Sequence, residues 1–189
     1  MEATPTLNRQ PLPPKNFSTL AEALDYAAQG QTGYNFYSGN GKLSMSLPYA
    51  ELRKKARTLA KKLIGLGLPR GSCVALVADT HPDFVRFFFA CQYAGLTPVP
   101  LPAQLNLSGR KAYIAQLKRL LSICQAQLAM ATDDFLPFLT SAAAGLNMRF
   151  VGNPADYDRL PESRALLQPI DATELAYLQY TSGSTRFPR

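Results

Sequence analysis

The sequence predicts an α/β fold with a mostly parallel sheet flanked by helices. Short apolar runs rich in valine, alanine and leucine alternate with longer amphipathic segments, and glycine or proline separates most of them. Strands that alternate with helices pair in parallel, because each helix returns the chain to the same end of the sheet. Apolar residues make up 47% of the 189 residues, which is enough for one substantial core or two small lobes.

The first part of the chain is expected to precede the sheet. Residues 1–16 contain four prolines and are typical of an extended lead-in segment. A helix is predicted over 18–28, because the Ser18 hydroxyl can cap its first amide groups. Strands are predicted over 34–37 and 43–47, and the Ser-Gly-Asn-Gly turn between them is typical of a β-hairpin.

The remaining elements alternate between helix and strand. Apolar residues at every third or fourth position indicate the helices, and short apolar runs indicate the strands. Asp133 or Asp134 is the expected N-cap of the last helix, and residues 152–173, with three prolines, are predicted to be a long connection. The predicted helices cover 49–66, 82–94, 110–125 and 133–144, and the predicted strands cover 73–78, 97–101, 128–131, 147–151 and 175–180.

Charge and cysteine usage limit the function classes. The formal net charge is +7, but the basic residues are dispersed over predicted helix faces without interleaved aromatic residues. This pattern favours a solvated surface over a nucleic-acid partner. The three cysteines lie far apart and lack a CxxC motif, so we expect buried reduced thiols in a cytoplasmic protein. No signal sequence or membrane-spanning run is apparent, so no transmembrane segment is expected.

Several residues have a possible chemical role and a more ordinary structural one. His81 could be a base, but no nucleophile lies near it in the sequence, so a structural or exposed role is favoured. Asp133 and Asp134 could ligate a metal but are better explained as a helix cap. Phe84 and Phe87–Phe89 could line a tunnel for an apolar ligand, although their helical spacing favours core packing. We therefore expect no metal-ligating residues in this chain.

The last residues contain the strongest chemical signal. Hydroxyl side chains and exposed amide groups can donate to polyphosphate oxygens, glycine permits a close approach, and a cation offsets the negative charge. The pattern is not a Walker loop, which requires Gly-Lys-Ser/Thr at its end. Because ordinary polar turns have a similar composition, the residues alone leave both interpretations open. The candidate binding residues are Thr181, Ser182, Gly183, Ser184, Thr185 and Arg189.

A family resemblance favours the phosphate interpretation. Residues 180–189 resemble the phosphate-loop signature YTSGSTGxPKG of the adenylate-forming superfamily, which includes acyl-CoA synthetases, luciferases and peptide-synthetase adenylation domains. In the same order along the chain, residues 47–52 are similar to the family's TYAEL, residues 71–76 to GDRVAL, and residues 87–101 to FFGCLYAGAVAVPL. The last of these, together with residues 178–180, most resembles fatty acyl-AMP ligases.

Two residues depart from the family signature. Arg186 stands where the superfamily usually has glycine. Fatty acyl-AMP ligases look tolerant at that position, so Arg186 favours a resemblance to them. Arg189 stands where lysine is usual. A guanidinium keeps the charge but replaces a compact ammonium with a planar fork. We expect the contact with phosphate to be retained.

The resemblance implies a fold and an activity. Residues 17–189 would be the N-terminal portion of the large domain of an AMP-dependent ligase, truncated at the phosphate loop. In the family, a carboxylate attacks the α-phosphate of ATP, with Mg²⁺ bound, to give an acyl-adenylate and pyrophosphate. The candidate residues would hold the β- and γ-phosphates. The catalytic residues would lie downstream, so none is expected within this chain and the fragment alone would be inactive.

The acceptor of the acyl group remains open at this point. The resemblance implies a fatty acid substrate and transfer to an acyl carrier protein, as in fatty acyl-AMP ligases. Transfer to coenzyme A by an acyl-CoA synthetase is the first alternative. The second is a non-catalytic binding module that retained the fold, with Arg186 and Arg189 as signs of lost chemistry.

Overall fold

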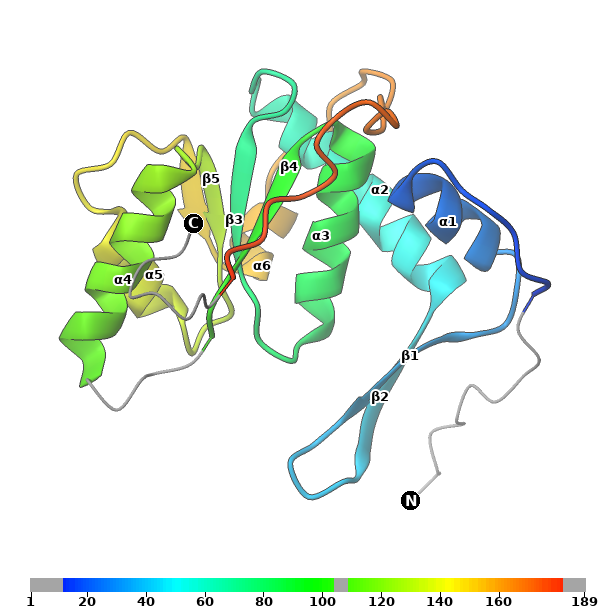
Figure 1. Ribbon diagram of the computed structural model, residues 1–189, viewed down its shortest axis with the longest axis horizontal. Coiled ribbons are helices and arrows are strands. Elements are labelled where there is room, and N and C mark those ends of the chain that lie inside the picture. The colour runs from blue at the N-terminus through cyan, green and yellow to red at the C-terminus, as the bar shows by residue number, and fades with distance from the viewer. Residues whose placement is uncertain (1–11, 104–108, 182–189) are drawn as a thin grey trace.

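The computed structural model describes residues 12–103 and 109–181, and Figure 1 shows their arrangement. The helices are α1 (Leu20–Ala27), α2 (Tyr49–Gly65), α3 (Pro82–Ala94), α4 (Gly109–Ile123), α5 (Leu136–Ala143) and α6 (Pro154–Asp158). The strands are β1 (Gly33–Tyr37), β2 (Leu43–Pro48), β3 (Cys73–Val77), β4 (Thr97–Leu101), β5 (Leu128–Met130) and β6 (Phe150–Gly152). Residues 1–11 of the predicted lead-in lie outside the described range, and residues 12–16 form neither helix nor strand.

Within the described residues, β4, β3, β5 and β6 form a parallel sheet in that order. Successive residues of β3 enter different hydrophobic cores, because neighbouring side chains of a strand point to opposite faces. Val74 and Leu76 pack with α1, α2, α3 and α6, whereas Ala75 and Val77 pack with α4 and α5. Figure 1 shows α3 and α2 on one side of the sheet and α4 and α5 on the other. The predicted α/β class is therefore confirmed.

The hairpin formed by β1 and β2 projects from this body (Figure 1). Its antiparallel register runs from the pair Gly33 and Pro48 to the pair Tyr37 and Leu43, close to the predicted strands. A Cβ atom on Gly33 would lie 2.2 Å from the carbonyl oxygen of Leu47. The two strands can approach this closely because residue 33 has no side chain.

The cap of α1 lies one residue later than predicted. Thr19, not Ser18, is the N-cap, and its hydroxyl accepts a hydrogen bond from the Glu22 amide at 3.2 Å. The Glu22 carboxylate in turn accepts the amide of Ser18 at 2.9 Å. Thr19 and Glu22 thus accept two amide groups at the start of the helix, and the predicted cap at Ser18 is wrong by one residue.

The predicted cap of α5 is wrong. The helix begins at Leu136, and its N-cap, Phe135, makes no side-chain capping bond. The Asp133 carboxylate instead accepts a hydrogen bond from the Asn153 side chain at 2.6 Å. Tertiary contact with the segment after β6 therefore took precedence over the local capping tendency of the two aspartates, Asp133 and Asp134.

The predicted connection over 152–173 contains a short helix, α6. Asn153 caps it, with its side chain accepting the Asp156 amide at 2.8 Å, while the Asp156 carboxylate accepts the Asn153 amide at 3.1 Å. Pro154 occupies the first helical turn, where the lack of an amide hydrogen costs nothing. The Asn-Pro-x-Asp pattern is visible in the sequence and could have revealed this helix.

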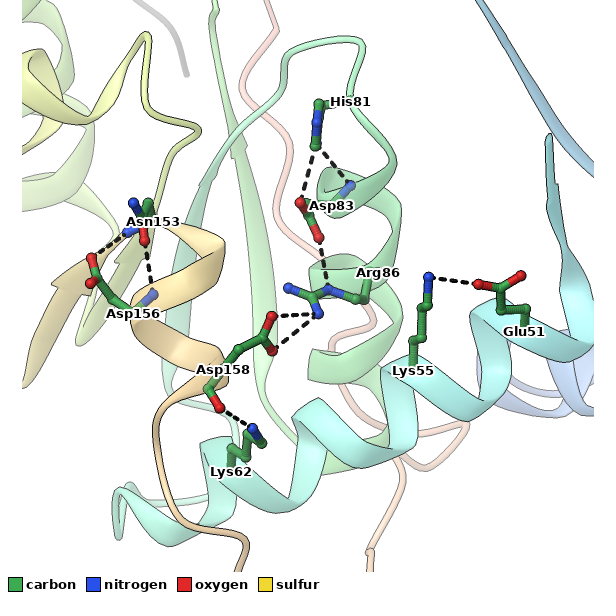
Figure 2. A network of polar contacts seen from close by, with 9 residues as sticks. All are labelled: Glu51, Lys55, Lys62, His81, Asp83, Arg86, Asn153, Asp156 and Asp158. Atoms are coloured by element: carbon green, nitrogen blue, oxygen red, sulfur yellow. Dashed lines mark hydrogen bonds and ion pairs between the residues drawn. The ribbon is translucent and has the colours of Figure 1, made fainter. Parts of the chain in front are cut away.

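Polar contacts join α6 to α2 and α3 (Figure 2). The Arg86 guanidinium of α3 contacts Asp83 at 2.9 Å and both carboxylate oxygens of Asp158 at 3.1 Å. Lys62 of α2 donates to the carbonyl of Asp158. Three helices that are distant in sequence are thereby joined through one residue, Asp158, at the end of α6.

The predicted strand over 175–180 is not formed. Leu178 donates its amide to the Pro98 carbonyl at 3.1 Å, which places this segment beside the outer edge of β4. Residues 98 and 100 of β4 are both prolines and have no amide hydrogen to give to a neighbouring strand. The edge can therefore accept hydrogen bonds but cannot complete a regular ladder. The remaining predicted elements are present, with ends shifted by a few residues.

Candidate functional site

A cavity of about 300 Å³ opens where β3 and β4 end. In parallel α/β sheets, ligands bind at the carboxyl ends of the strands, where the connecting loops leave a crevice. The cavity has this position, since Ala78 directly follows β3 and Leu101 is the last residue of β4. Its lining residues are Ala78, Pro100, Leu101, Pro102, Gln116, Leu120, Gln179, Tyr180 and Thr181.

Thr181, the first candidate phosphate-binding residue, lines this cavity. The chain reaches it along the edge of β4, with Leu178 bonded to Pro98. The other candidates, Ser182, Gly183, Ser184, Thr185 and Arg189, lie outside the described residues. The hydroxyl of Thr181 is a suitable donor for a phosphate oxygen, so the donor chemistry at the described end of the loop fits a nucleotide phosphate.

Tyr180 holds the chain at the entrance to the loop. Its hydroxyl donates to the Leu120 carbonyl of α4 at 3.0 Å. Burial, together with the neighbouring Cys124 thiol, raises the pKa of Tyr180. The hydroxyl therefore remains protonated at neutral pH and keeps its role as a donor.

Polar residues that follow β3 and β5 were not identified as candidates from the sequence. Asp79, just after β3, accepts a hydrogen bond from the Thr132 hydroxyl, just after β5, at 2.6 Å. The other carboxylate oxygen of Asp79 is buried and has no partner among the described residues. Tyr113 of α4 donates to the Pro102 carbonyl at 2.6 Å, and burial raises the pKa of Tyr113 to about 12. The position of Asp79 directly after an apolar strand was the available signal.

The other residues weighed from the sequence have structural contacts. His81 is the N-cap of α3, and its Nδ1 atom accepts the Asp83 amide at 3.2 Å. Phe87 is fully buried, and Phe84, Phe88 and Phe89 pack against the same core. Core packing, the favoured interpretation, is what the structure shows for these aromatic residues.

The cysteines differ in burial. Cys91 and Cys124 are buried and Cys73 is partly buried, so the expectation of buried thiols is correct for two of them; all three are free. Burial raises the pKa of Cys91, which keeps this thiol protonated. In the part of the chain that is described, no cluster of three or more histidine, cysteine or acidic residues could hold a metal ion. None of the described helices is long and apolar enough to cross a membrane.

Comparison with known proteins identifies the family. Residues 24–188 match the AMP-binding enzyme family. The chain belongs to this family of adenylate-forming ligases. It is 43% identical over 186 residues to a Caulobacter vibrioides protein whose name places it among the acyl-CoA synthetases, covering 98% of this chain and 32% of that protein. It is 30% identical over 180 residues to a medium-chain fatty acid–acyl-carrier-protein ligase of Moorena producens, covering 92% of this chain and 30% of that protein.

A solved structure supports the same assignment. It comes from a study of fatty acyl-adenylate ligases from E. coli and L. pneumophila and is 43% identical, with a TM-score of 0.85. The match covers 92% of this chain and 31% of the solved chain. The chain therefore spans about a third of the length of these three relatives. It has the fold of the N-terminal part of adenylate-forming enzymes.

Proposed function

We propose that this chain is the N-terminal part of the large domain of a ligase that activates a fatty acid with ATP. The product would be the acyl-adenylate, with pyrophosphate as the leaving group. The observation that supports this most strongly is the position of Thr181. Thr181 is the first residue of the hydroxyl-rich segment, and it lines the cavity at the carboxyl ends of β3 and β4. Membership of the AMP-binding enzyme family agrees with this proposal.

The residues of the loop would bind and orient rather than react covalently. The hydroxyl and amide groups of residues 181–185 would hold the β- and γ-phosphates, and Arg189 would supply the countercharge. Donors aimed at the leaving group stabilise charge that increases in the transition state, and a fixed substrate removes the entropy cost of alignment. Mg²⁺, when bound with ATP, would neutralise further phosphate charge. The group that holds it would lie downstream of this chain.

Acid-dependent ATP–pyrophosphate exchange tests this function. The protein to use is the whole polypeptide, containing this chain and the downstream region that its relatives possess. Fatty acids of several lengths should each be tested for exchange of labelled pyrophosphate into ATP. We expect exchange that requires both the acid and Mg²⁺. A whole protein that binds ATP without catalysing exchange would instead support a non-catalytic module, the reading suggested by Arg186 and Arg189.

For the acceptor, we propose an acyl carrier protein. One relative is named for this transfer, but another is named as an acyl-CoA synthetase, so coenzyme A is the alternative. Supplying the adenylated enzyme with coenzyme A and a phosphopantetheinylated carrier protein together would decide between them. We expect acyl carrier protein to accumulate in the acylated form. Acyl-CoA as the main product would favour the alternative.

The proposed location is the cytoplasm. Reduced, buried thiols such as those of Cys91 and Cys124 persist there.

A further inference from the structure

Residues 161–181, which we call the strap, connect α6 to the candidate loop without forming a helix or a strand. Figure 1 shows the end of this segment running past α3 and β4. Three backbone hydrogen bonds join the described strap to the rest of the molecule. The strap amides of Ser163, Ile170 and Leu178 donate to the carbonyls of Lys61, Gln92 and Pro98 at 3.1, 2.8 and 3.1 Å. The prolines of β4 prevent a regular ladder along this edge, so side-chain contacts add to the few backbone hydrogen bonds that hold the strap.

Arg70 makes the most extensive of these side-chain contacts. Its guanidinium donates to both carboxylate oxygens of Glu174, each at 2.5 Å. It also donates to the carbonyls of Gln168 at 2.8 Å and Pro169 at 2.6 Å. A guanidinium presents its N–H donors in one rigid plane and can bond to all of these oxygens at once, which a lysine could not do. Gly95 leaves room for the Arg70 side chain, because a Cβ atom on residue 95 would lie 2.4 Å from the nearest guanidinium nitrogen.

Gln92 of α3 contacts a part of the strap that lies nearer to the candidate loop. Its side-chain amide donates to the Ala176 carbonyl at 2.5 Å, and its backbone carbonyl accepts the Ile170 amide. The residue is fully buried, yet its side-chain oxygen has no hydrogen-bond partner among the described residues. An unpaired buried oxygen costs stability, whereas the side-chain amide of Gln92 forms a hydrogen bond with the strap. An apolar side chain at this position would remove the oxygen but would also leave the Ala176 carbonyl without this donor.

We propose that Arg70 and Gln92 are positioning residues for the phosphate loop, acting through the strap that they hold against α3 and β4. Neither touches the proposed nucleotide site. Each holds a part of the strap upstream of Thr181, and Tyr180 and Thr181 enter the cavity at its end. The inference rests on the proposed function, since it assumes that the residues after Thr181 bind phosphate.

The test uses Arg70→Ala and Gln92→Leu in the whole protein. Both variants should lower kcat in ATP–pyrophosphate exchange and raise the KM for ATP, while the KM for the acid is unchanged. A displacement of about 1 Å can lower a rate by about 100-fold, which sets the upper size of the expected effect. Amide hydrogen exchange at Ile170 and Leu178 should increase in both variants, independently of activity.

Two matched variants control for general destabilisation. Arg53→Ala removes an arginine with a similar contact, since Arg53 meets Asp25 at 2.5 Å with 40% of its side chain exposed, against 38% for Arg70. Tyr93→Phe alters Tyr93, the fully buried neighbour of Gln92. The Tyr93 hydroxyl donates to Asp25 at 2.7 Å and not to the strap. Both controls should keep the wild-type KM for ATP and the wild-type exchange of the strap amides.

The outcomes separate the two proposals. If the wild-type protein catalyses exchange but Arg70→Ala and Gln92→Leu leave both the KM for ATP and the strap amides unchanged, the positioning role is overturned. The same conclusion follows if the controls change these quantities equally. If the wild-type protein shows no acid-dependent exchange, the proposed function fails, while faster amide exchange at Ile170 and Leu178 would still demonstrate the anchoring itself.

Discussion

Ser184 and Thr185 are two consecutive hydroxyl residues in the sequence that follows Thr181. If this segment holds the β- and γ-phosphates, replacing both by alanine in the whole protein removes two donors to the leaving group. Loss of one such donor typically lowers turnover by about 100-fold or more. We therefore expect at least that loss in ATP–pyrophosphate exchange.

A suitable control for this pair is Ser122→Ala, which removes an exposed hydroxyl of α4 that donates to the Lys118 carbonyl. This variant should retain wild-type kinetics. Unchanged kinetics in the double alanine variant would mean that the loop is not the phosphate site. The hydroxyl residue types of this segment predict phosphate binding. Among them, the structure describes only Thr181 and places it at the cavity.

At the scale of elements, the hairpin depends on the close approach of β1 and β2 at Gly33. A methyl group at this position would meet the backbone of Leu47 and Pro48, which cannot move aside as a flexible side chain could. Gly33→Ala should therefore destabilise the protein by about 1 to 3 kcal/mol, the usual cost of overpacking. Denaturant unfolding measures this difference. Gly39→Ala is the matched control, since a Cβ atom there meets nothing within 4 Å, and equal losses in both variants would refute the argument.

The strap contains a contact that should depend on pH. The Arg70 guanidinium, helped by the Asp171 amide, lowers the pKa of the Glu174 carboxyl to about 2. Because the folded-state pKa lies below the unfolded value of about 4.3, this contact stabilises the strap fully above that value. The stabilisation is lost as the pH falls through the folded-state pKa.

A ¹³C NMR titration of the Glu174 side chain would check this pH dependence. We expect a midpoint near pH 2 in the wild type and a clear upward shift in Arg70→Ala. An ordinary glutamate midpoint in the wild type would show that the ion pair does not persist in solution.

At the scale of the whole molecule, this chain should not be an active enzyme by itself. It spans about a third of the length of the relatives named above, and the catalytic residues that we propose would lie downstream of it. We expect the isolated 189-residue chain to show no acid-dependent ATP–pyrophosphate exchange under conditions where the whole protein does. Exchange by the isolated chain would contradict this assignment of the catalytic groups.

Periodicity and local turn chemistry were sufficient to predict most elements and the α/β class. The apolar spacing of α2 and α3 and the runs of β3 and β4 act over a few neighbouring residues, so they can be read along the chain. Predictions failed where distant groups competed with local ones. Asp133 bonds to Asn153 instead of capping α5, and the segment before Thr181 meets a strand edge without enough amide donors to form a ladder.

The proposed phosphate-binding role of residues 181–189 stays a prediction that rests on consecutive residues, because such a loop draws its donors from one short stretch of backbone and side chains. The contacts that hold the segment before it could not be predicted in this way. Arg70 meets Glu174, Gln92 meets Ala176, and Asp79 meets Thr132 only after the sheet and its helices have packed. No spacing in the chain encodes such pairs, since their separation depends on how elements far apart in the sequence are placed in three dimensions.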